Sequence, residues 1–188
     1  MRYNSRMRVA NPITYITAST PLGVALVAAS SRGVCALALG DQKSALIADL
    51  GASFGGDRCR PADAETSAVV RGWLDTVIEA LHAGVDGMPR ILSAPLTVPL
   101  DLAGTAFQLA VWRELQAVPA GQVVTYTELA RAIGAPRTVR AVGSACGANR
   151  VALLVPCHRA VRQDGQLGGY RWGLERKAQL LAWERTGR

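Results

Sequence analysis

The sequence predicts an α+β protein with two parts, a small antiparallel-sheet domain followed by a mostly helical domain. Short β-branched segments separated by turns dominate the first half, whereas apolar side chains at helical spacing dominate the second half. The charge changes at the same place. Residues 1–104 hold nine Lys/Arg and nine Asp/Glu, so residues 105–188 carry the whole net charge of +7. We therefore expect a flexible tail at 1–11, a scaffold domain at 12–103 and a second domain at 104–188.

The first domain is expected to begin with an antiparallel sheet. Residues 13–20, 24–30 and 33–39 are rich in β-branched and other apolar side chains. Ser31-Arg32 would join the last two of these strands in a β-hairpin. A short helix over 43–50 and a Gly-rich loop are expected to follow.

One long helix and one more strand should complete this domain. Residues 64–82 carry apolar side chains at i, i+3, i+4 and i+7 spacing, which predicts an amphipathic helix. A turn is expected at 86–89 and a strand at 96–102, where apolar and polar residues alternate. Residues 1–104 contain no combination of side chains typical of a catalytic site, so we expect them to act as a scaffold.

The second domain is predicted to contain a helix-turn-helix. Thr105 is a candidate N-cap for a first helix that ends before Pro119, and Thr125 is a candidate N-cap for a short helix that reaches Ile133. A further helix over 138–148 follows a Gly-containing turn. Helical pairs of this kind are also common outside DNA-binding proteins, so the motif alone leaves the partner open.

The helix over 138–148 is unusually smooth, because Arg140 is its one long side chain among small ones. A decorated helix is about 10–12 Å across, and the B-form minor groove is about 6 Å wide. A smooth helix could enter a widened minor groove, where Arg140 could replace a flipped-out base in the stack. Close packing against another helix would use Gly143, Ala145 and Gly147 equally well, so both interpretations stay open.

The candidate chemistry lies at Cys157, within the segment Val155–Arg159. Pro156 stiffens the backbone before the thiol. His158 and Arg159 could supply a base or a positive charge that favours the thiolate. A buried, inert cysteine is the alternative interpretation of the same residues.

Gly168–Gly173 could form part of a pocket. Its glycines permit close approach of the backbone, and Tyr170 or Trp172 could stack on a flat base. The same segment could instead be a loop that packs its own aromatic side chains.

A final helix is predicted over 175–184. Its Glu184 could orient His158 and so complete a Cys-His-Glu chain of nucleophile, base and orienting group. A thiol hydrolase is the competing hypothesis for such a chain, and a solvated terminal glutamate is the simpler interpretation of Glu184.

Composition narrows the class of protein. Cys35, Cys59, Cys146 and Cys157 contain no C-x-x-C pair, so we expect no zinc site and no disulfide framework, but reduced thiols in the cytoplasm. No apolar run approaches the roughly 18–20 residues that span a bilayer. Nineteen of the 21 basic side chains are arginine, which suits forked contacts with phosphate and points to a nucleic-acid partner.

From residue 104 onward the sequence resembles the O6-alkylguanine-DNA alkyltransferases, also called methylated-DNA–protein-cysteine methyltransferases. The resemblance rests on five segments at the spacing of that family: Gly104-Thr-Ala-Phe-Gln108, Arg140-Ala-Val142, Asn149, Val155-Pro-Cys-His-Arg159 and Gly169-Tyr-Arg-Trp-Gly173. It extends weakly back to residue 14 and is strongest to the C-terminal half of bacterial Ada proteins. The tail at 1–11 is too short to hold Ada's upstream regulatory domain, so we expect no transcriptional activation.

The resemblance implies a ribonuclease-H-like first domain and a winged helix-turn-helix second domain. It also implies DNA repair by direct reversal, in which the alkyl group of O6-alkylguanine, and of O4-methylthymine, moves irreversibly from duplex DNA to Cys157. The helix-turn-helix would dock in the minor groove and the base would be flipped out. Each molecule would act once, as a monomer, without a cofactor or a metal. Lesion-sensing relatives that do not repair are the competing class, but they lack the reactive cysteine.

Individual roles follow from the resemblance. Cys157 would accept the alkyl group, and His158 would deprotonate it through a water. Glu184 would orient His158, and Asn149 would brace the turn between the smooth helix and the thiol. Tyr126 would crowd a phosphate and help to rotate the nucleotide out.

The resemblance also implies contacts with DNA and with the base. Arg140 would fill the vacated stack, and the DNA-facing surface would include Thr138, Ala141 and Gly143. The base pocket would be lined by Tyr170, Arg171, Ala160 and Gly168. The Arg171 backbone N–H would lie near guanine O6, and the carbonyls of Cys157 and Ala160 near the exocyclic amine. Trp172 would narrow the pocket and favour methyl over benzyl adducts.

Overall fold

The N-terminal part is built on a four-stranded sheet of order β3-β2-β1-β4. The computed structural model describes residues 11–82, 88–92 and 96–186, so most of the expected tail and the first half of the turn expected at 86–89 lie outside the described residues. Strands β1 (Ile13–Thr20), β2 (Gly23–Ser30) and β3 (Gly33–Gly40) form the predicted antiparallel meander. The sequence analysis missed β4 (Cys59–Pro61), which pairs parallel to β1 in what was expected to be a loop.

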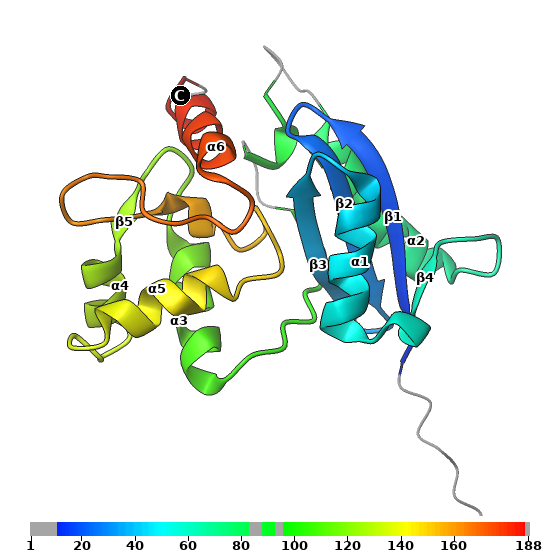
Figure 1. The fold of residues 1–188 in the computed structure, drawn as a ribbon, viewed down its shortest axis with the longest axis horizontal. Helices are drawn as coiled ribbons and strands as arrows, with labels where there is room; N and C mark the ends of the chain where they lie inside the picture. The colour runs from blue at the N-terminus through cyan, green and yellow to red at the C-terminus, as the bar shows by residue number, and fades with distance from the viewer. Residues whose placement is uncertain (1–10, 83–87, 93–95, 187–188) are drawn as a thin grey trace, which may run out of the picture.

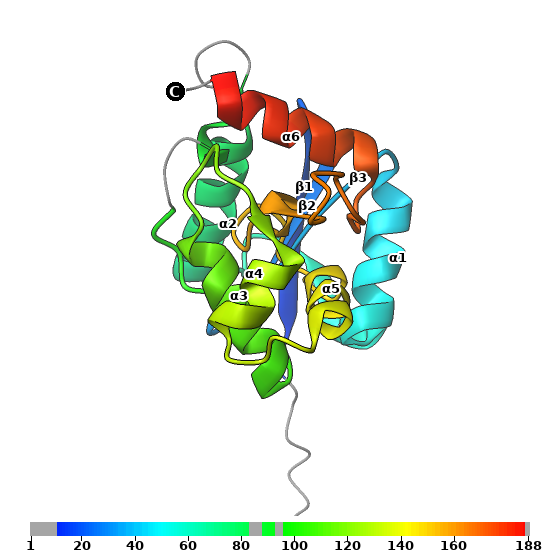
Figure 2. The ribbon, with the colours of Figure 1, turned by 90° about the vertical axis from the view of Figure 1, so that its left-hand side faces the viewer.

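Both faces of this sheet are covered. Helix α1 (Lys43–Phe54) packs on one face and α2 (Ala68–Leu81) on the other, and Figure 2 shows the sheet between them. Alternate residues of β2 therefore enter two different cores, Leu26 beside α1 and Val27 beside α2. A strand buried on both faces is expected to be a continuous apolar run, as β2 is. Helix α1 is longer than predicted, and α2 begins later than predicted.

The strand predicted over 96–102 is wrong. This segment makes only an isolated bridge between Leu100 and Val34 among the described residues. The Val34 N–H donates to the Pro99 carbonyl at 2.8 Å, but Pro99 has no N–H of its own and interrupts any longer ladder. The alternating apolar side chains instead pack against the core as the chain crosses to the helical part.

The helical part contains the predicted helix-turn-helix. Helices α3 (Ala106–Ala117) and α4 (Tyr126–Ala132) begin at the predicted caps, and both caps are capping boxes, Thr105 with Gln108 and Thr125 with Glu128. Helix α5 (Val139–Gly147) follows the turn and packs against α3 and α4 (Figure 1).

The remaining elements of this part are short strands and the last helix. Strands β5 (Val124–Thr125) and β6 (Ala160–Val161) pair in parallel, and helix α6 covers Leu174–Thr186. The α+β fold class is confirmed. Among residues 11–82, 88–92 and 96–186, no helix is long and apolar enough to cross a membrane.

The two parts are joined by backbone hydrogen bonds close to the candidate site. The Leu37 N–H of β3 donates to the Arg150 carbonyl at 2.9 Å, and the Ala152 N–H donates to the Leu37 carbonyl at 2.9 Å. The sheet is therefore tied directly to the segment that leads to Cys157.

Candidate active site

Asn149 holds the segment that presents Cys157. Its Nδ2 donates to Cys157 Sγ at 3.2 Å and to the Val155 carbonyl at 2.9 Å, while its Oδ1 accepts from the Val151 N–H at 2.9 Å. Asn149 lies just beyond the C-terminal end of α5 and is almost fully buried. One amide side chain thus connects the end of α5 to the thiol.

His158 and Glu184 form a buried pair beside the thiol. His158 Nε2 and Glu184 Oε1 lie 2.9 Å apart, and both side chains are fully shielded from solvent. The Gly121 N–H donates to Glu184 Oε2 at 3.1 Å. Sequence reasoning placed Glu184 next to His158, and the structure brings them together.

Arg159 binds the same carboxylate. Its Nη2 lies 2.7 Å from Glu184 Oε1, and its Nη1 donates to the Val118 carbonyl at 2.5 Å. The suggestion that Arg159 supplies a positive charge to the thiol is therefore wrong, because its guanidinium is directed to Glu184. Adjacency in sequence did not reveal this, since successive residues of a tight turn point in different directions.

The electrostatics of the pair favour a neutral imidazole next to an ionised carboxylate. Burial opposes ionisation of Glu184, but hydrogen bonds from His158 and Arg159 outweigh it and lower its pKa to about 2. Burial also lowers the pKa of His158, against the opposing effect of Glu184. With Nε2 bound to the carboxylate, Nδ1 is left to accept a proton, and within the described part of the chain it has no hydrogen-bond partner.

The resting thiol is protonated. Burial raises the pKa of Cys157 to about 11, although the hydrogen bond from Asn149 and the charge of Lys177 act in the opposite direction. Nucleophilic attack by this sulfur therefore needs a base to remove the proton.

Lys177 is a buried residue next to the site that sequence reasoning missed. It is fully buried, and its Nζ donates to the carbonyls of Ala160 at 2.5 Å, of Gly169 at 3.3 Å and of Leu167. Only the ammonium form has three N–H donors for three carbonyls. Burial lowers the pKa of Lys177 to about 8, and the nearby thiols of Cys157 and Cys146 partly oppose that shift.

A signal for Lys177 was present in the sequence. It is one of two lysines among 21 basic residues. It also stands at helical spacing from Leu180, Leu181 and Glu184, which together with it form the buried face of α6.

The thiol opens onto a cavity of about 500 Å³ beneath the helix-turn-helix. This volume lies within the range of small-molecule sites, roughly 300–1,000 Å³. The cavity is lined by Tyr126, Gly143, Cys146, Gly147, Cys157, Arg162, Gly168, Gly169, Tyr170 and Arg171. Most of the predicted pocket residues are therefore brought together here, and Cys146 places a second thiol in the same cavity.

Gly168 and Tyr126 make one wall of this cavity. Gly168 has φ +66°, and a Cβ added there would lie 2.8 Å from Tyr126 Oη. Glycine is thus required both by the backbone conformation and by the approach of the tyrosine. Tyr126 is half-buried, and burial raises its pKa to about 12.

Tyr170 forms the wall of the cavity next to His158. Its ring makes an edge contact with His158 at 6.4 Å and with Trp172 at 5.1 Å between ring centroids. Its buried hydroxyl has no hydrogen-bond partner within the residues that the structure describes.

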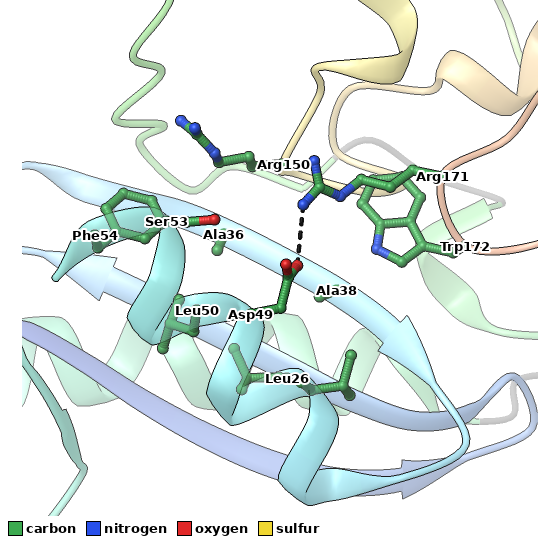
Figure 3. A pocket seen from close by; sticks show the side chains of 11 residues that line it. Leu26, Ala36, Ala38, Asp49, Leu50, Ser53, Phe54, Arg150, Arg171 and Trp172 are labelled. Atoms are coloured by element: carbon green, nitrogen blue, oxygen red, sulfur yellow. Dashed lines mark hydrogen bonds and ion pairs between the residues drawn. The ribbon is translucent and has the colours of Figure 1, made fainter. Parts of the chain in front are cut away.

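Two predicted pocket contacts differ from expectation. Trp172 is buried against the sheet and lines a different cavity with Leu26 and Ala38, so the expectation that it narrows the pocket is wrong (Figure 3). Ala160, which was expected to line the pocket, is fully buried and is not among the residues that line the cavity. Its carbonyl accepts from Lys177, while the Cys157 carbonyl accepts from the Ala160 N–H. Since a carbonyl has two lone pairs, each retains one acceptor site.

The structure of α5 favours an exposed smooth face over close packing against another helix as the reason for its small residues. A Cβ added at Gly143 or Gly147 would meet no atom of the described residues within 4 Å, so packing does not require glycine at either position. Ala145, in contrast, is buried and its carbonyl accepts from Trp112 Nε1 at 2.9 Å. The smooth face therefore points outward.

The predicted DNA-facing residues lie on or beside this face. Arg140 and Ala141 are exposed near the start of α5, next to the half-buried Gly143. Thr138 precedes the helix, and its hydroxyl donates to the Ala135 carbonyl at 2.7 Å.

A helix-turn-helix above a cavity that contains a buried thiol, with a His-Glu pair next to it, defines a cysteine-dependent, nucleic-acid-directed protein. Residues 106–186 match the family model described as "6-O-methylguanine DNA methyltransferase, DNA binding domain". A methylated-DNA–protein-cysteine methyltransferase of Mycolicibacterium paratuberculosis is 44% identical over 117 residues, which are 61% of this chain and 70% of that protein. The chain belongs to the methylated-DNA–protein-cysteine methyltransferase family.

Two further similarities extend over nearly the whole chain. The bifunctional transcriptional activator/DNA repair enzyme Ada of Escherichia coli is 48% identical over 172 residues, which are 92% of this chain but 45% of Ada. The chain thus spans less than half the length of that relative. The structure of Mycobacterium tuberculosis OGT in complex with DNA has a TM-score of 0.72 at 30% identity and covers 92% of this chain and 93% of that one.

Proposed function

We propose that this protein repairs alkylated DNA by moving the alkyl group of O6-alkylguanine to Cys157 Sγ, once per molecule. O4-methylthymine, which presents a similar alkylated oxygen, is a second substrate. The observation that carries the proposal is the placement of Cys157 at a base-sized cavity, next to the buried His158–Glu184 pair and below α5. Family membership supports the same reaction.

The reaction begins with removal of the thiol proton. Neutral His158 takes this proton at Nδ1 through a water, and Glu184 stabilises the resulting imidazolium. The thiolate then attacks the alkyl carbon, so that a sulfur–carbon bond forms while the carbon–O6 bond breaks, and the leaving guanine takes up a proton. The product is a thioether, which is stable, and the protein is consumed without a cofactor.

The substrate reaches the thiol by flipping out of the duplex. The outward face of α5, with Ala141, Gly143 and Thr138, enters a widened minor groove, and Arg140 takes the place of the flipped base. Tyr126 lines the entrance of the cavity and crowds the phosphate of the rotated nucleotide. The net charge of +7 supports binding to DNA, and the DNA complex of the mycobacterial OGT is a precedent in a similar fold.

The flipped base lies against Tyr170 and Gly168. The Arg171 backbone N–H donates to O6, and the free acceptor sites of the Cys157 and Ala160 carbonyls receive the exocyclic amine. Residues 104–188 thus form the DNA-binding and transfer domain, and residues 12–103 form its scaffold. The protein works as a single copy in the cytoplasm.

Intact-protein mass after incubation with a duplex that contains one O6-methylguanine tests the proposal. We expect the mass of one added methyl group, located on the peptide that contains Cys157. Cys157→Ala should bind the duplex with unchanged affinity and gain no mass, whereas Cys59→Ser, a change at a thiol far from the cavity, should still be methylated.

The absence of added mass at saturating duplex would refute the proposal. Turnover beyond one equivalent on an ester or a peptide would favour the thiol hydrolase instead.

A further inference from the structure

Helix α1 of the sheet part contacts both chain segments that flank the thiol. We propose that α1, through Asp49 and Phe54, sets the width of the alkyl pocket and so determines which adducts are accepted. This inference rests on the proposed function and deepens it, because it names positioning residues for the same site. These residues act through Arg171 and Arg150 and touch no reacting atom.

The first contact holds the wall that contains Tyr170. Arg171 Nη2 lies 3.0 Å from Asp49 Oδ2, and Figure 3 shows the guanidinium directed toward Asp49 on α1. Tyr170 faces His158, whereas Arg171 and Trp172 both line the cavity over α1 and the sheet. Arg171, which lines the thiol cavity, is therefore held in place by the sheet part.

The second contact holds the chain segment that follows Asn149. The Arg150 guanidinium carbon lies 5.6 Å from the centroid of the Phe54 ring, a cation–π distance. Arg150 directly follows Asn149, whose Nδ2 donates to Cys157 Sγ. The Arg150 carbonyl also accepts from Leu37 of β3. Figure 3 shows Arg150 and Arg171 extending over the same helix.

One rigid element thus contacts both the pocket wall at Arg171 and the segment whose Asn149 binds the thiol. At 1.5 Å per residue, Asp49 and Phe54 are about 7.5 Å apart along the axis of α1. The Asp49 and Arg171 side chains are 55% and 31% exposed, so this ion pair restrains the wall without contributing much to folding. A restraint of that strength can hold the wall closely around a small adduct. Removing the ion pair should loosen the wall but leave the fold intact.

Rates of transfer from two duplexes, one with O6-methylguanine and one with O6-benzylguanine, test the inference. In Asp49→Asn the wall at Arg171 gains freedom, which weakens the fit to methyl more than the fit to benzyl. We expect the methyl-to-benzyl rate ratio to fall about fivefold, the factor that corresponds to one solvated ion pair at its upper value. Duplex affinity should stay within about twofold, because the ion pair joins two side chains that are not proposed to contact the duplex.

Two matched variants separate positioning from general destabilisation. Asp49→Glu keeps the carboxylate within reach of Arg171 and should restore the parent ratio. Asp75→Asn removes the same charge from the exposed face of α2 and should leave the ratio unchanged. Asp49→Asn combined with Phe54→Leu should lower the ratio further, since both segments are then released.

A ratio in Asp49→Asn within twofold of the parent value would overturn the inference, and so would an equal change in Asp75→Asn. Failure of the proposed function looks different, since the parent protein would then transfer neither group.

Discussion

His158 Nε2 and Glu184 Oε1 are 2.9 Å apart in a site where neither side chain reaches solvent. The carboxylate is shared with Arg159 and with the Gly121 N–H, so Glu184 connects the end of α6 to the thiol segment and to the loop after α3. The orientation of the imidazole therefore depends on a residue that is distant in sequence, near the C-terminal end of α6.

Glu184→Gln should impair both transfer and folding. The amide cannot stabilise an imidazolium, so we expect the single-turnover rate to fall about 100-fold, a typical contribution of a general base. The half-buried Arg159 also loses its counter-ion, which should lower the free energy of unfolding by about 3 kcal/mol in urea titrations, the lower end of the range for buried pairs. Glu175→Gln, at an exposed position on the same helix, is the control and should change neither quantity.

Acid should destabilise the protein through the same residue. The pKa of Glu184 is about 2 in the folded protein, below its ordinary value of 4.5. As the pH falls, the unfolded chain takes up the proton first, so the free energy of unfolding contributed by Glu184 is present above about pH 4.5 and is lost toward about pH 2. Urea titrations across this window should show a steeper decline in the parent than in Glu184→Gln. Parallel curves would contradict the assignment.

Gly168→Ala should block the pocket. Its φ of +66° strains an alanine, and the added Cβ would lie 2.8 Å from Tyr126 Oη, so the tyrosine must move. We expect a loss of about 1–3 kcal/mol in the free energy of unfolding together with a marked loss of the methyl transfer rate. Gly165→Ala is the matched control, because Gly165 has φ +80° and no described atom within 4 Å of an added Cβ. Gly165→Ala should lose a similar free energy of unfolding, because its backbone is strained in the same way, but should keep the parent methyl transfer rate.

Arg140→Ala should slow repair of duplex DNA more than reaction with the free base. Only the duplex needs a side chain in the vacated stack, and a stacking contact contributes about 1–3 kcal/mol, so we expect about a tenfold loss on the duplex and little change with free O6-methylguanine. Arg113→Ala, which removes the same charge from the exposed face of α3, should affect neither substrate. Equal losses on both substrates would disprove the stacking role of Arg140.

Features encoded by neighbouring residues were predictable from the sequence. The antiparallel meander, the capping boxes at Thr105 and Thr125 and the helix-turn-helix each follow from short-range patterns. Strand β4 was missed because its three residues, one of them Pro61, carry no strand pattern and form a strand only by pairing with distant β1. The segment at 96–102 was misassigned for the opposite reason, since alternation also arises when a connecting segment packs on a core.

The candidate site was predictable in its members but not in its internal contacts. Cys157, His158, Asn149 and Glu184 were identified, yet the direction of Arg159 and the burial of Trp172 depend on tertiary packing. Lys177 escaped notice because a lysine on a terminal helix is ordinarily solvated, and only the loop folded around its ammonium reveals its role.

The hydrogen bond from Asn149 to Cys157 Sγ has a consequence for the protein after it has acted. The resting sulfur is a buried, protonated thiol 3.2 Å from Asn149 Nδ2, and alkylation puts a bulkier S–alkyl group in the place of its small S–H. Alkylation therefore crowds the link between α5 and the thiol segment, and such overpacking destabilises a folded protein by about 1–3 kcal/mol. The spent molecule should melt at a lower temperature than the fresh one, and a difference of about 1–2 kcal/mol is enough for proteases to clear one form ahead of the other.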